Sequence, residues 1–194
     1  MFGHVIFDLD KTLVNLNVDW EGARNEVIEY TKNHGIDWHD GLSLWMLPFN
    51  FPNFREHKKD VDKIFEKWEN KAIEEGKPQE IGYAVELIKK IDGKVMGVVS
   101  NNNHSTIERV LERIGVKDRF GYVLGRDDVF EIKPLPGSVE KAVELGGVEK
   151  SETIFVGDSR WDFIAGSRAG VPVFLMRNED DAKTLEYILN LTLQ

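Results

Sequence analysis

Two aspartates stand close together near the start of the chain, as Asp8-Leu9-Asp10, directly after an apolar run. In an extended segment, side chains two residues apart point the same way, so both carboxylates face one site. They would repel each other unless a cation or a shared proton lies between them. A hard divalent ion with oxygen ligands, Mg²⁺ by default, is the simplest partner. A solvated acidic loop is the alternative that this motif alone leaves open.

A second acidic pair follows another apolar run, in residues 157–162 (GDSRWD). Asp158 and Asp162 are four residues apart, so they share one face if a helix begins here. An aspartate that only caps the helix start is the common alternative. A second acidic pair at a second strand end nevertheless favours a shared site.

Small polar groups and one lysine follow at further points of the chain. Ser100 and Asn101 end the apolar run 95–99, where a hydroxyl, an amide and helix N–H groups can bind phosphate oxygens. Lys133 precedes Pro134, and a lysine next to a rigid proline suits a positioned cation for an anionic ligand. Taken singly, helix capping is the favoured interpretation for Ser100 and Asn101, and a solvated side chain for Lys133.

Short apolar runs alternate with amphipathic segments along most of the chain. The runs predicted as strands are residues 4–7, 94–99, 121–124, 153–156 and 171–175. The segments with helical spacing of apolar residues are 81–91, 107–114 and 139–143, and Gly115 stands where a helix cap belongs. Runs that are apolar on both faces are typical of a parallel sheet covered by helices. The pattern predicts an α/β fold, with a Rossmann-like parallel sheet core and helices on both faces.

One region interrupts the alternation, because no second strand is predicted until about residue 94. Residues 19–33 and 58–75 have helical spacing, and an aromatic-rich connector, residues 36–54, joins them. We therefore expect a small α-helical cap inserted after the first strand. The expected division is a core domain of residues 1–14 and 80–194 and a helical cap domain of residues 15–79.

The composition limits the function classes. The chain has 194 residues, 41% hydrophobic and 30% charged, which allows a packed core and argues against disorder. A net charge of −9 repels phosphate backbones, so we expect no nucleic-acid partner. The absence of cysteine excludes disulfides, thiol catalysis and cysteine metal sites. No apolar stretch approaches the roughly 20 residues that span a bilayer, and no secretory signal is evident, so we expect a cytoplasmic protein without a membrane partner.

Read in chain order, four motifs of this sequence resemble those of the haloacid dehalogenase superfamily. They are residues 8–14 (DLDKTLV), 98–101 (VVSN), 133–134 (KP) and 157–162 (GDSRWD). The resemblance covers the whole core, and the insertion occupies the place of the helical cap in phosphoglycolate phosphatase-like members. It implies a Mg²⁺-dependent phosphatase that hydrolyses a small phosphomonoester metabolite, of the phosphoglycolate or sugar-phosphate type. It further implies a monomer or a small homo-oligomer.

The resemblance also implies roles for individual residues. Asp8 matches the nucleophile that becomes an aspartyl phosphate, and Asp10 matches the general acid and base. Lys133 matches the lysine that steadies the nucleophile and the charge of the transferred group. Thr12 and Ser100 match phosphate-binding hydroxyls, and we expect Asn101 to bind substrate as well because its amide can bond phosphate oxygens. The implied metal site consists of Asp8, the backbone carbonyl of Asp10, and Asp158, with Asp162 supporting the metal from behind.

Several alternatives remain open from the sequence. A haloacid dehalogenase of the same fold needs no acid at position 10, so Asp10 favours a phosphatase. A phosphomutase shares the acid and the aspartyl phosphate but excludes water. A non-catalytic member that binds a phospho-ligand or a partner would usually have lost the nucleophile or the acid. Lys11 stands where glycine is more usual, and Trp161 is a bulky residue within the last motif; the roles of both stay open.

Overall fold

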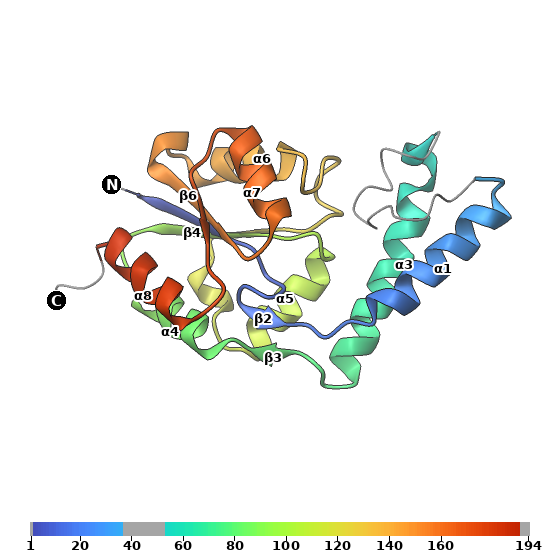
Figure 1. Cartoon of the computed structure of the whole chain (residues 1–194), viewed down its shortest axis with the longest axis horizontal. Coiled ribbons are helices and arrows are strands. Elements are labelled where there is room, and N and C mark those ends of the chain that lie inside the picture. Colours follow the sequence, from blue (N-terminus) through green and yellow to red (C-terminus); the bar gives the residue numbers. More distant parts are fainter. Residues whose placement is uncertain (1, 37–52, 191–194) are drawn as a thin grey trace.

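A five-stranded parallel sheet forms the centre of the protein in this computed structural model, which describes residues 2–36 and 53–190 (Figure 1). The strand order is β5-β4-β1-β6-β7, and every neighbouring pair is parallel. The strands are β1 (His4–Phe7), β4 (Val95–Val99), β5 (Tyr122–Leu124), β6 (Thr153–Gly157) and β7 (Val173–Leu175). The predicted α/β fold with a parallel sheet is confirmed, and all five predicted strands are present.

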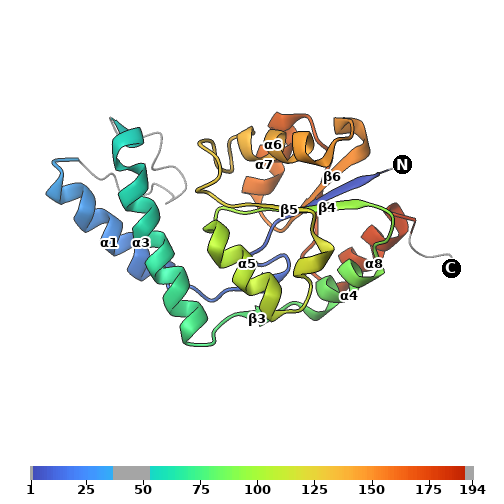
Figure 2. The ribbon, with the colours of Figure 1, turned by 180° about the vertical axis from the view of Figure 1, so that it is seen from behind.

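Helices cover both faces of this sheet, as Figures 1 and 2 show from opposite sides. One face carries α4 (Gly82–Lys90), α5 (His104–Arg113) and α8 (Glu179–Ile188), and the other carries α6 (Gly137–Gly146) and α7 (Arg160–Ala169). Side chains of β1 alternate between the two layers: Val5 and Phe7 pack with the first group, and Ile6 packs with the second. Each layer is a buried apolar cluster, which is what a strand apolar on both faces requires. Short 3₁₀ turns occur at Lys117–Arg119 and Lys150–Glu152.

Two details of the helices bear on the sequence expectations. Gly115, expected as a helix cap, follows α5 with a φ of 69°, so it takes the left-handed conformation that glycine tolerates. The helix α8 was not among the predicted segments. It begins with the three acidic residues 179–181, and its buried contacts come from Ala182 and Leu185, which is a short apolar signal.

The helical insertion leaves and re-enters the sheet domain through a two-stranded antiparallel ribbon. The ribbon pairs β2 (Val14–Asn15) with β3 (Gln79–Glu80). The insertion therefore follows β2, between β1 and β4, in the part of the chain where the sequence predicted a helical insertion. Two-residue strands are too short for a periodic pattern, which explains why neither β2 nor β3 was predicted from the sequence.

The insertion itself is a pair of packed helices, α1 (Trp20–Asn33) and α3 (Phe54–Glu74), which lie side by side beyond the strand ends (Figures 1 and 2). Their contact is apolar, with Ala23 and Val27 on one helix and Val61 and Phe65 on the other. The two predicted helices are thus confirmed. The aromatic connector expected at 36–54 lies largely outside the described residues, as does the side chain of Phe54. Within the described residues, no helix is long and apolar enough to cross a membrane.

Candidate active site

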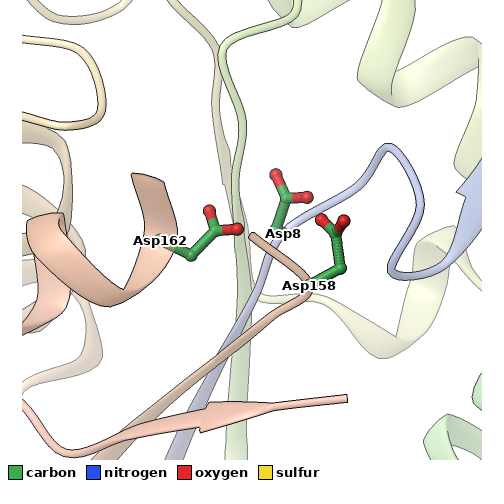
Figure 3. A group of neighbouring side chains, drawn as sticks. All are labelled: Asp8, Asp158 and Asp162. Carbon is green, nitrogen blue, oxygen red and sulfur yellow. The ribbon is translucent and has the colours of Figure 1, made fainter. Parts of the chain in front are cut away.

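Three aspartates converge at the carboxyl edge of the sheet (Figure 3). Asp8 directly follows β1, Asp158 follows the neighbouring β6, and Asp162 lies in the first turn of α7. One oxygen of each carboxylate lies within 4.8 Å of the others. Parallel strands bring these residues together because their carboxyl ends meet at one edge. The backbone N–H of Asp8 extends the β1–β6 ladder by bonding to the carbonyl of Val156 at 2.8 Å, which fixes where its side chain begins.

Lys133 is the cation at the centre of this aspartate cluster (Asp8, Asp158 and Asp162). Its Nζ lies 2.6 Å from Oδ1 of Asp8, 2.6 Å from Oδ1 of Asp162 and 3.2 Å from the carbonyl of Val99. The lysine is 3% exposed, so these partners replace its water shell. Burial alone would lower the pKa of Lys133, but Asp162 and Asp8 outweigh burial and raise it above its ordinary value. Lys133 is therefore charged, and three carboxylates around one ammonium leave an excess of negative charge.

Asp162 is held from both sides. Its Oδ1 accepts from Lys133, and its Oδ2 accepts from the backbone N–H of Ser159 at 3.0 Å and from its hydroxyl at 2.5 Å. Ser159 is the N-cap of α7, and the two residues form a reciprocal capping box. Burial would raise the pKa of Asp162, but the bonds from Lys133 and Ser159 outweigh it and lower that pKa. Lys133 engages Oδ1 and two donors of Ser159 engage Oδ2, so Asp162 is suited to fixing Lys133 and supporting a cation from behind.

Asp8 and Asp158 are the carboxylates suited to direct contact with a cation. Burial raises the pKa of Asp8 to about 7, even though Lys133 acts in the opposite direction. Burial also raises the pKa of Asp158, and the nearby charge of Asp162 adds to this. A bound cation would remove this penalty by supplying the missing positive charge. Because the donor set consists only of carboxylate oxygens, it fits a hard ion such as Mg²⁺.

Asp10 and Thr12 lie in the loop between β1 and β2. Asp10 is half-buried, and its Oδ1 accepts the backbone N–H of Leu16 at 2.9 Å, which sets the direction of its carboxyl. Burial raises its pKa, and bonds from Leu16 and from the indole of Trp20 reduce that effect. Thr12 is fully buried, and its hydroxyl donates to Oδ2 of Asp8 at 3.3 Å.

The loop after β4 carries the remaining predicted residues. The hydroxyl of Ser100 donates to Oδ1 of Asn102 at 2.8 Å and accepts the N–H of Asn102 at 3.3 Å. The amide of Asn101 clamps the backbone of Lys133: its Nδ2 donates to the Lys133 carbonyl at 2.9 Å, and its Oδ1 accepts the Lys133 N–H at 3.1 Å. This clamp fixes the segment that carries the buried lysine.

A cavity of about 560 Å³ opens over these groups. Its lining from the sheet domain consists of Asp8, Asp10, Lys11, Ser100, Asn101, Asn102, Lys133, Asp158, Ser159, Trp161 and Asp162. Its lining from α1 of the insertion consists of Trp20, Glu21 and Arg24. The cavity is therefore shared between the sheet domain and the insertion. It is large enough for a small metabolite.

The structure brings nearly all the predicted site residues to this cavity. The exception is Thr12, which is not among the described residues that line it and instead contacts Asp8. The sequence did not single out Asn102, Ser159 or the three α1 residues. Asn102 lay within an Asn-Asn-Asn run beside two named residues, which was a usable signal, whereas the polar face of α1 carried none. Trp161 is half-buried on the cavity wall, with the guanidinium of Arg160 4.4 Å from the centre of its ring.

Comparison with known proteins agrees with this geometry. Residues 5–176 match the haloacid dehalogenase-like hydrolase family. The chain belongs to this family, and the resemblance read from its four motifs is confirmed.

Individual relatives add detail. The chain is 26% identical over 208 residues to pyrophosphatase PpaX of Halalkalibacterium halodurans, covering 95% of this chain and 91% of that protein. It is 29% identical over 180 residues to the phosphoglycolate phosphatase of Aquifex aeolicus, covering 88% of this chain and 83% of that protein. A solved HAD-superfamily hydrolase of subfamily IA, variant 1, from Geobacter sulfurreducens has the same fold, with a TM-score of 0.62 at 19% identity over 95% of this chain and 100% of that one. Its relatives make this chain an enzyme of the HAD-like phosphatase type.

Proposed function

We propose that the chain is a Mg²⁺-dependent phosphatase that hydrolyses a small phosphorylated metabolite through a covalent intermediate on Asp8. The observation that carries this proposal is the contact of Lys133 with both Asp8 and Asp162 inside an aspartate cluster that lines a cavity. A phosphoryl group carries spread negative charge, and a carboxylate can approach it only when neighbouring positive charge offsets the repulsion. This site supplies one such charge through Lys133 and oxygen ligands for a second.

In the first step, an oxygen of Asp8 attacks phosphorus while the bond from phosphorus to the leaving oxygen breaks. Lys133 holds Oδ1 of Asp8, so the carboxylate keeps one orientation during the attack. Asp10 gives its proton to the leaving alcohol, which would otherwise depart as a poor alkoxide.

In the second step, a water molecule attacks the phosphorus of the aspartyl phosphate. Asp10, now ionised, takes a proton from that water. The bond between phosphorus and Asp8 breaks, which frees inorganic phosphate and regenerates the carboxylate. The Leu16 N–H keeps Asp10 oriented toward the reacting groups in both steps.

Asp8 and Asp158 are the residues that would hold Mg²⁺, with the backbone carbonyl of Asp10 as a third protein ligand. Asp162 would stabilise the site by fixing Lys133 and the start of α7. When bound, the ion supplies positive charge that offsets the phosphate oxygens. Thr12 supports Asp8, and Ser100 and Asn101 belong to the loop that faces the phosphate.

The substrate class follows from the cavity and the relatives. Because α1 contributes Trp20, Glu21 and Arg24 to the wall, a helical cap of residues 15–79 would limit substrate size over a core of residues 1–14 and 80–194. Arg24 favours a substrate with a second anionic group, as in phosphoglycolate. Inorganic pyrophosphate is a second candidate, favoured by the pyrophosphatase relative. We further propose a cytoplasmic monomer or small homo-oligomer.

A substrate panel tests this function. Purified protein is assayed with an aryl phosphate, phosphoglycolate, sugar phosphates and pyrophosphate, with Mg²⁺ and with EDTA. We expect turnover that needs Mg²⁺ and a clear preference within the panel. The absence of magnesium-dependent turnover on every compound would contradict the proposal.

The acid role of Asp10 has its own control. Asp10→Asn should slow alkyl phosphates far more than the aryl phosphate, because an aryl leaving group departs without much protonation. Equal losses on both would assign Asp10 a structural role only.

A further inference from the structure

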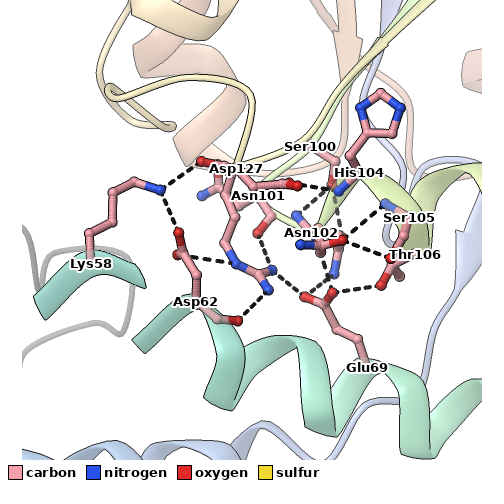
Figure 4. A network of polar contacts seen from close by, with 12 residues as sticks. Lys58, Asp62, Glu69, Ser100, Asn101, Asn102, His104, Ser105, Thr106 and Asp127 are labelled. Carbon is pink, nitrogen blue, oxygen red and sulfur yellow. Dashed lines mark hydrogen bonds and ion pairs between the residues drawn. The ribbon is translucent and has the colours of Figure 1, made fainter. Parts of the chain in front are cut away.

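A second buried polar network lies away from the aspartate cluster, between α3 of the insertion and the sheet domain (Figure 4). Its centre is the ion pair of Glu69 on α3 with Arg126 in the loop after β5, joined by Oε1 and Nη1 at 2.5 Å. Glu69 is 0% exposed and Arg126 is 1% exposed. An ion pair this deep is retained only when other hydrogen bonds satisfy the remaining polar atoms.

The remaining bonds of Glu69 go to one short segment, the loop after β4 and the start of α5. Oε1 also accepts Nδ2 of Asn102 at 3.2 Å. Oε2 accepts the backbone N–H of Asn103 at 3.0 Å and the hydroxyl of Thr106 at 2.8 Å. The Glu69 carboxylate of the insertion thus accepts hydrogen bonds from three residues of the segment that follows Ser100.

Arg126 binds the same loop from the other side. Its backbone N–H donates to the carbonyl of Asn102 at 2.9 Å, and its Nη1 reaches the carbonyl of Asn101 at 3.2 Å. Two residues of α3 hold the arginine in turn: Nη2 donates to the carbonyl of Asp62 at 3.0 Å, and Lys58 donates to the Arg126 carbonyl at 2.9 Å. The arginine therefore joins the insertion helix to the loop.

Two chains of hydrogen bonds lead from this network into the candidate active site. The first runs from Glu69 to Asn102, whose Oδ1 accepts the Ser100 hydroxyl. The second runs from Arg126 to Asn101, whose amide clamps the backbone of Lys133. Both end on groups that line the cavity. Neither Glu69 nor Arg126 lies among the described residues of that lining.

We propose that Glu69 is a positioning residue, which together with Arg126 fixes the conformation of the loop of residues 100–102. Phosphate binding thereby depends on the position of the insertion relative to the sheet domain. Because Ser100 is oriented through Asn102, a shift of the insertion displaces the phosphate-binding groups. Displacements of about 1 Å in a positioning group lower rates by up to about a hundredfold. This inference rests on the proposed phosphatase activity, because it assigns a task to the same site.

Three variants separate positioning from mere stability. Glu69→Gln keeps the size of the side chain but removes its charge. The double variant Glu69→Leu with Arg126→Leu removes both buried charges, which preserves stability while abolishing the side-chain bonds to the loop. Glu74→Gln, at an exposed position near the end of the same helix, is the matched control.

The readouts are KM for an aryl phosphate and the inhibition constant of inorganic phosphate, both at saturating Mg²⁺. We expect both constants to rise about tenfold in Glu69→Gln and at least as much in the double variant, with no change in Glu74→Gln. A purely structural role would lower the fraction of active enzyme, and hence the apparent kcat, without moving either constant. Unchanged constants in the folded double variant would overturn the inference, and so would failure of Glu69→Gln to fold.

Hydrogen exchange keeps this test separate from that of the proposed function. If the wild-type protein shows no phosphatase activity, the proposed function fails, but exchange can still be measured. The inference then requires faster exchange of the amides of residues 100–106 and of Lys133 in the double variant, at equal global stability. Equal exchange in the two proteins would overturn it.

Discussion

Lys133 and Arg126 are both buried cations in loops of the sheet domain, yet their surroundings differ. Lys133 faces three carboxylates and lines a cavity. Arg126 pairs with Glu69, whose two oxygens accept four hydrogen bonds, and lies between the insertion and the loop after β4. The first group has an excess of negative charge. The Glu69–Arg126 pair is neutral, and the Glu69 carboxylate is fully hydrogen-bonded.

This difference separates a binding site from a structural joint. An excess of buried negative charge is unfavourable without a further cation, so the aspartate cluster suits the cation and the anionic substrate of the proposed function. A neutral pair whose carboxylate already accepts four hydrogen bonds has no free acceptor to offer a ligand. Its effect is on geometry and stability, because removing Glu69 leaves the buried Arg126 with only the longer ion pair to Asp62, at 3.4 Å.

Asp8→Asn gives the largest expected effect and tests the aspartate cluster. The substitution removes the proposed nucleophile but leaves Asp162 to pair with Lys133, so kcat should fall by about a thousandfold or more while the fold survives. The free energy of unfolding in EDTA should not fall, because one of several mutually repelling carboxylates is gone. Activity assays and urea unfolding measure the two effects. Near-normal turnover would mean that Asp8 is not the nucleophile, and a large loss of stability would make this cluster structural as well.

Glu69→Ala tests the Glu69–Arg126 pair, and here we expect a loss of stability where Asp8→Asn gives a loss of activity. Arg126 would keep its charge in a buried place, with the Asp62 carboxylate 3.4 Å from its Nε as the remaining ionic partner, so the free energy of unfolding should fall by about 3 kcal/mol. Urea unfolding at neutral pH measures this loss, with exposed Glu74→Ala as the control. The double change to leucine should recover most of it, since no charge is then left unpaired. A loss below about 1 kcal/mol in Glu69→Ala, the range of an exposed pair, would remove the contrast between the two regions.

His4 is a third buried titratable group, and it differs from Lys133 and Arg126 because, in the part of the chain that the structure describes, it contacts hydroxyl groups and no carboxylate. It lies at the start of β1, and its ring nitrogens contact the hydroxyls of Thr153 at 3.2 Å and Tyr122 at 2.7 Å. Burial lowers the pKa of His4 to about 4 from the ordinary 6.5. Between these values the unfolded chain binds a proton that the native protein does not. The stability from neutral His4 is therefore complete above pH 6.5 and is lost as the pH falls to about 4.

The size of this effect follows from the width of the window. One pKa unit corresponds to about 1.4 kcal/mol, so up to about 3 kcal/mol of stability is lost over this range. Urea unfolding of wild type and His4→Gln at pH 7, 6, 5 and 4.5 isolates the contribution, because all other groups titrate in both proteins. We expect a smaller decline in the variant. Parallel curves would show that folding does not lower the pKa of His4.

The two buried charge clusters were not equally visible in the sequence. The aspartate cluster was predicted because its residues follow apolar runs, and parallel strands must bring such positions to one edge. Glu69 gave a weaker signal. It occurs at a buried position of α3, in helical register with Val61, Phe65 and Ala72. A charge in such a row indicates a buried partner, but no local pattern says that this partner is Arg126, 57 residues away. The same limit explains why α1 was predicted as a helix while its cavity residues were not.

Lys11→Gly has the smallest expected effect and concerns the edge of the aspartate cluster. Lys11 is exposed and has a φ of 65°, a left-handed conformation that disfavours a residue with a Cβ. Glycine relieves this strain but is more flexible in the unfolded chain, so the net gain in the free energy of unfolding should be about 0.5–1 kcal/mol. Lys11→Ala, which removes the charge but keeps the Cβ, should give no such gain. If the ammonium of Lys11 is only solvated, KM for an aryl phosphate stays unchanged in both variants. A similar rise of KM in both would instead add Lys11 to Lys133 and Arg24 as cations of the cavity that offset the charge of the substrate.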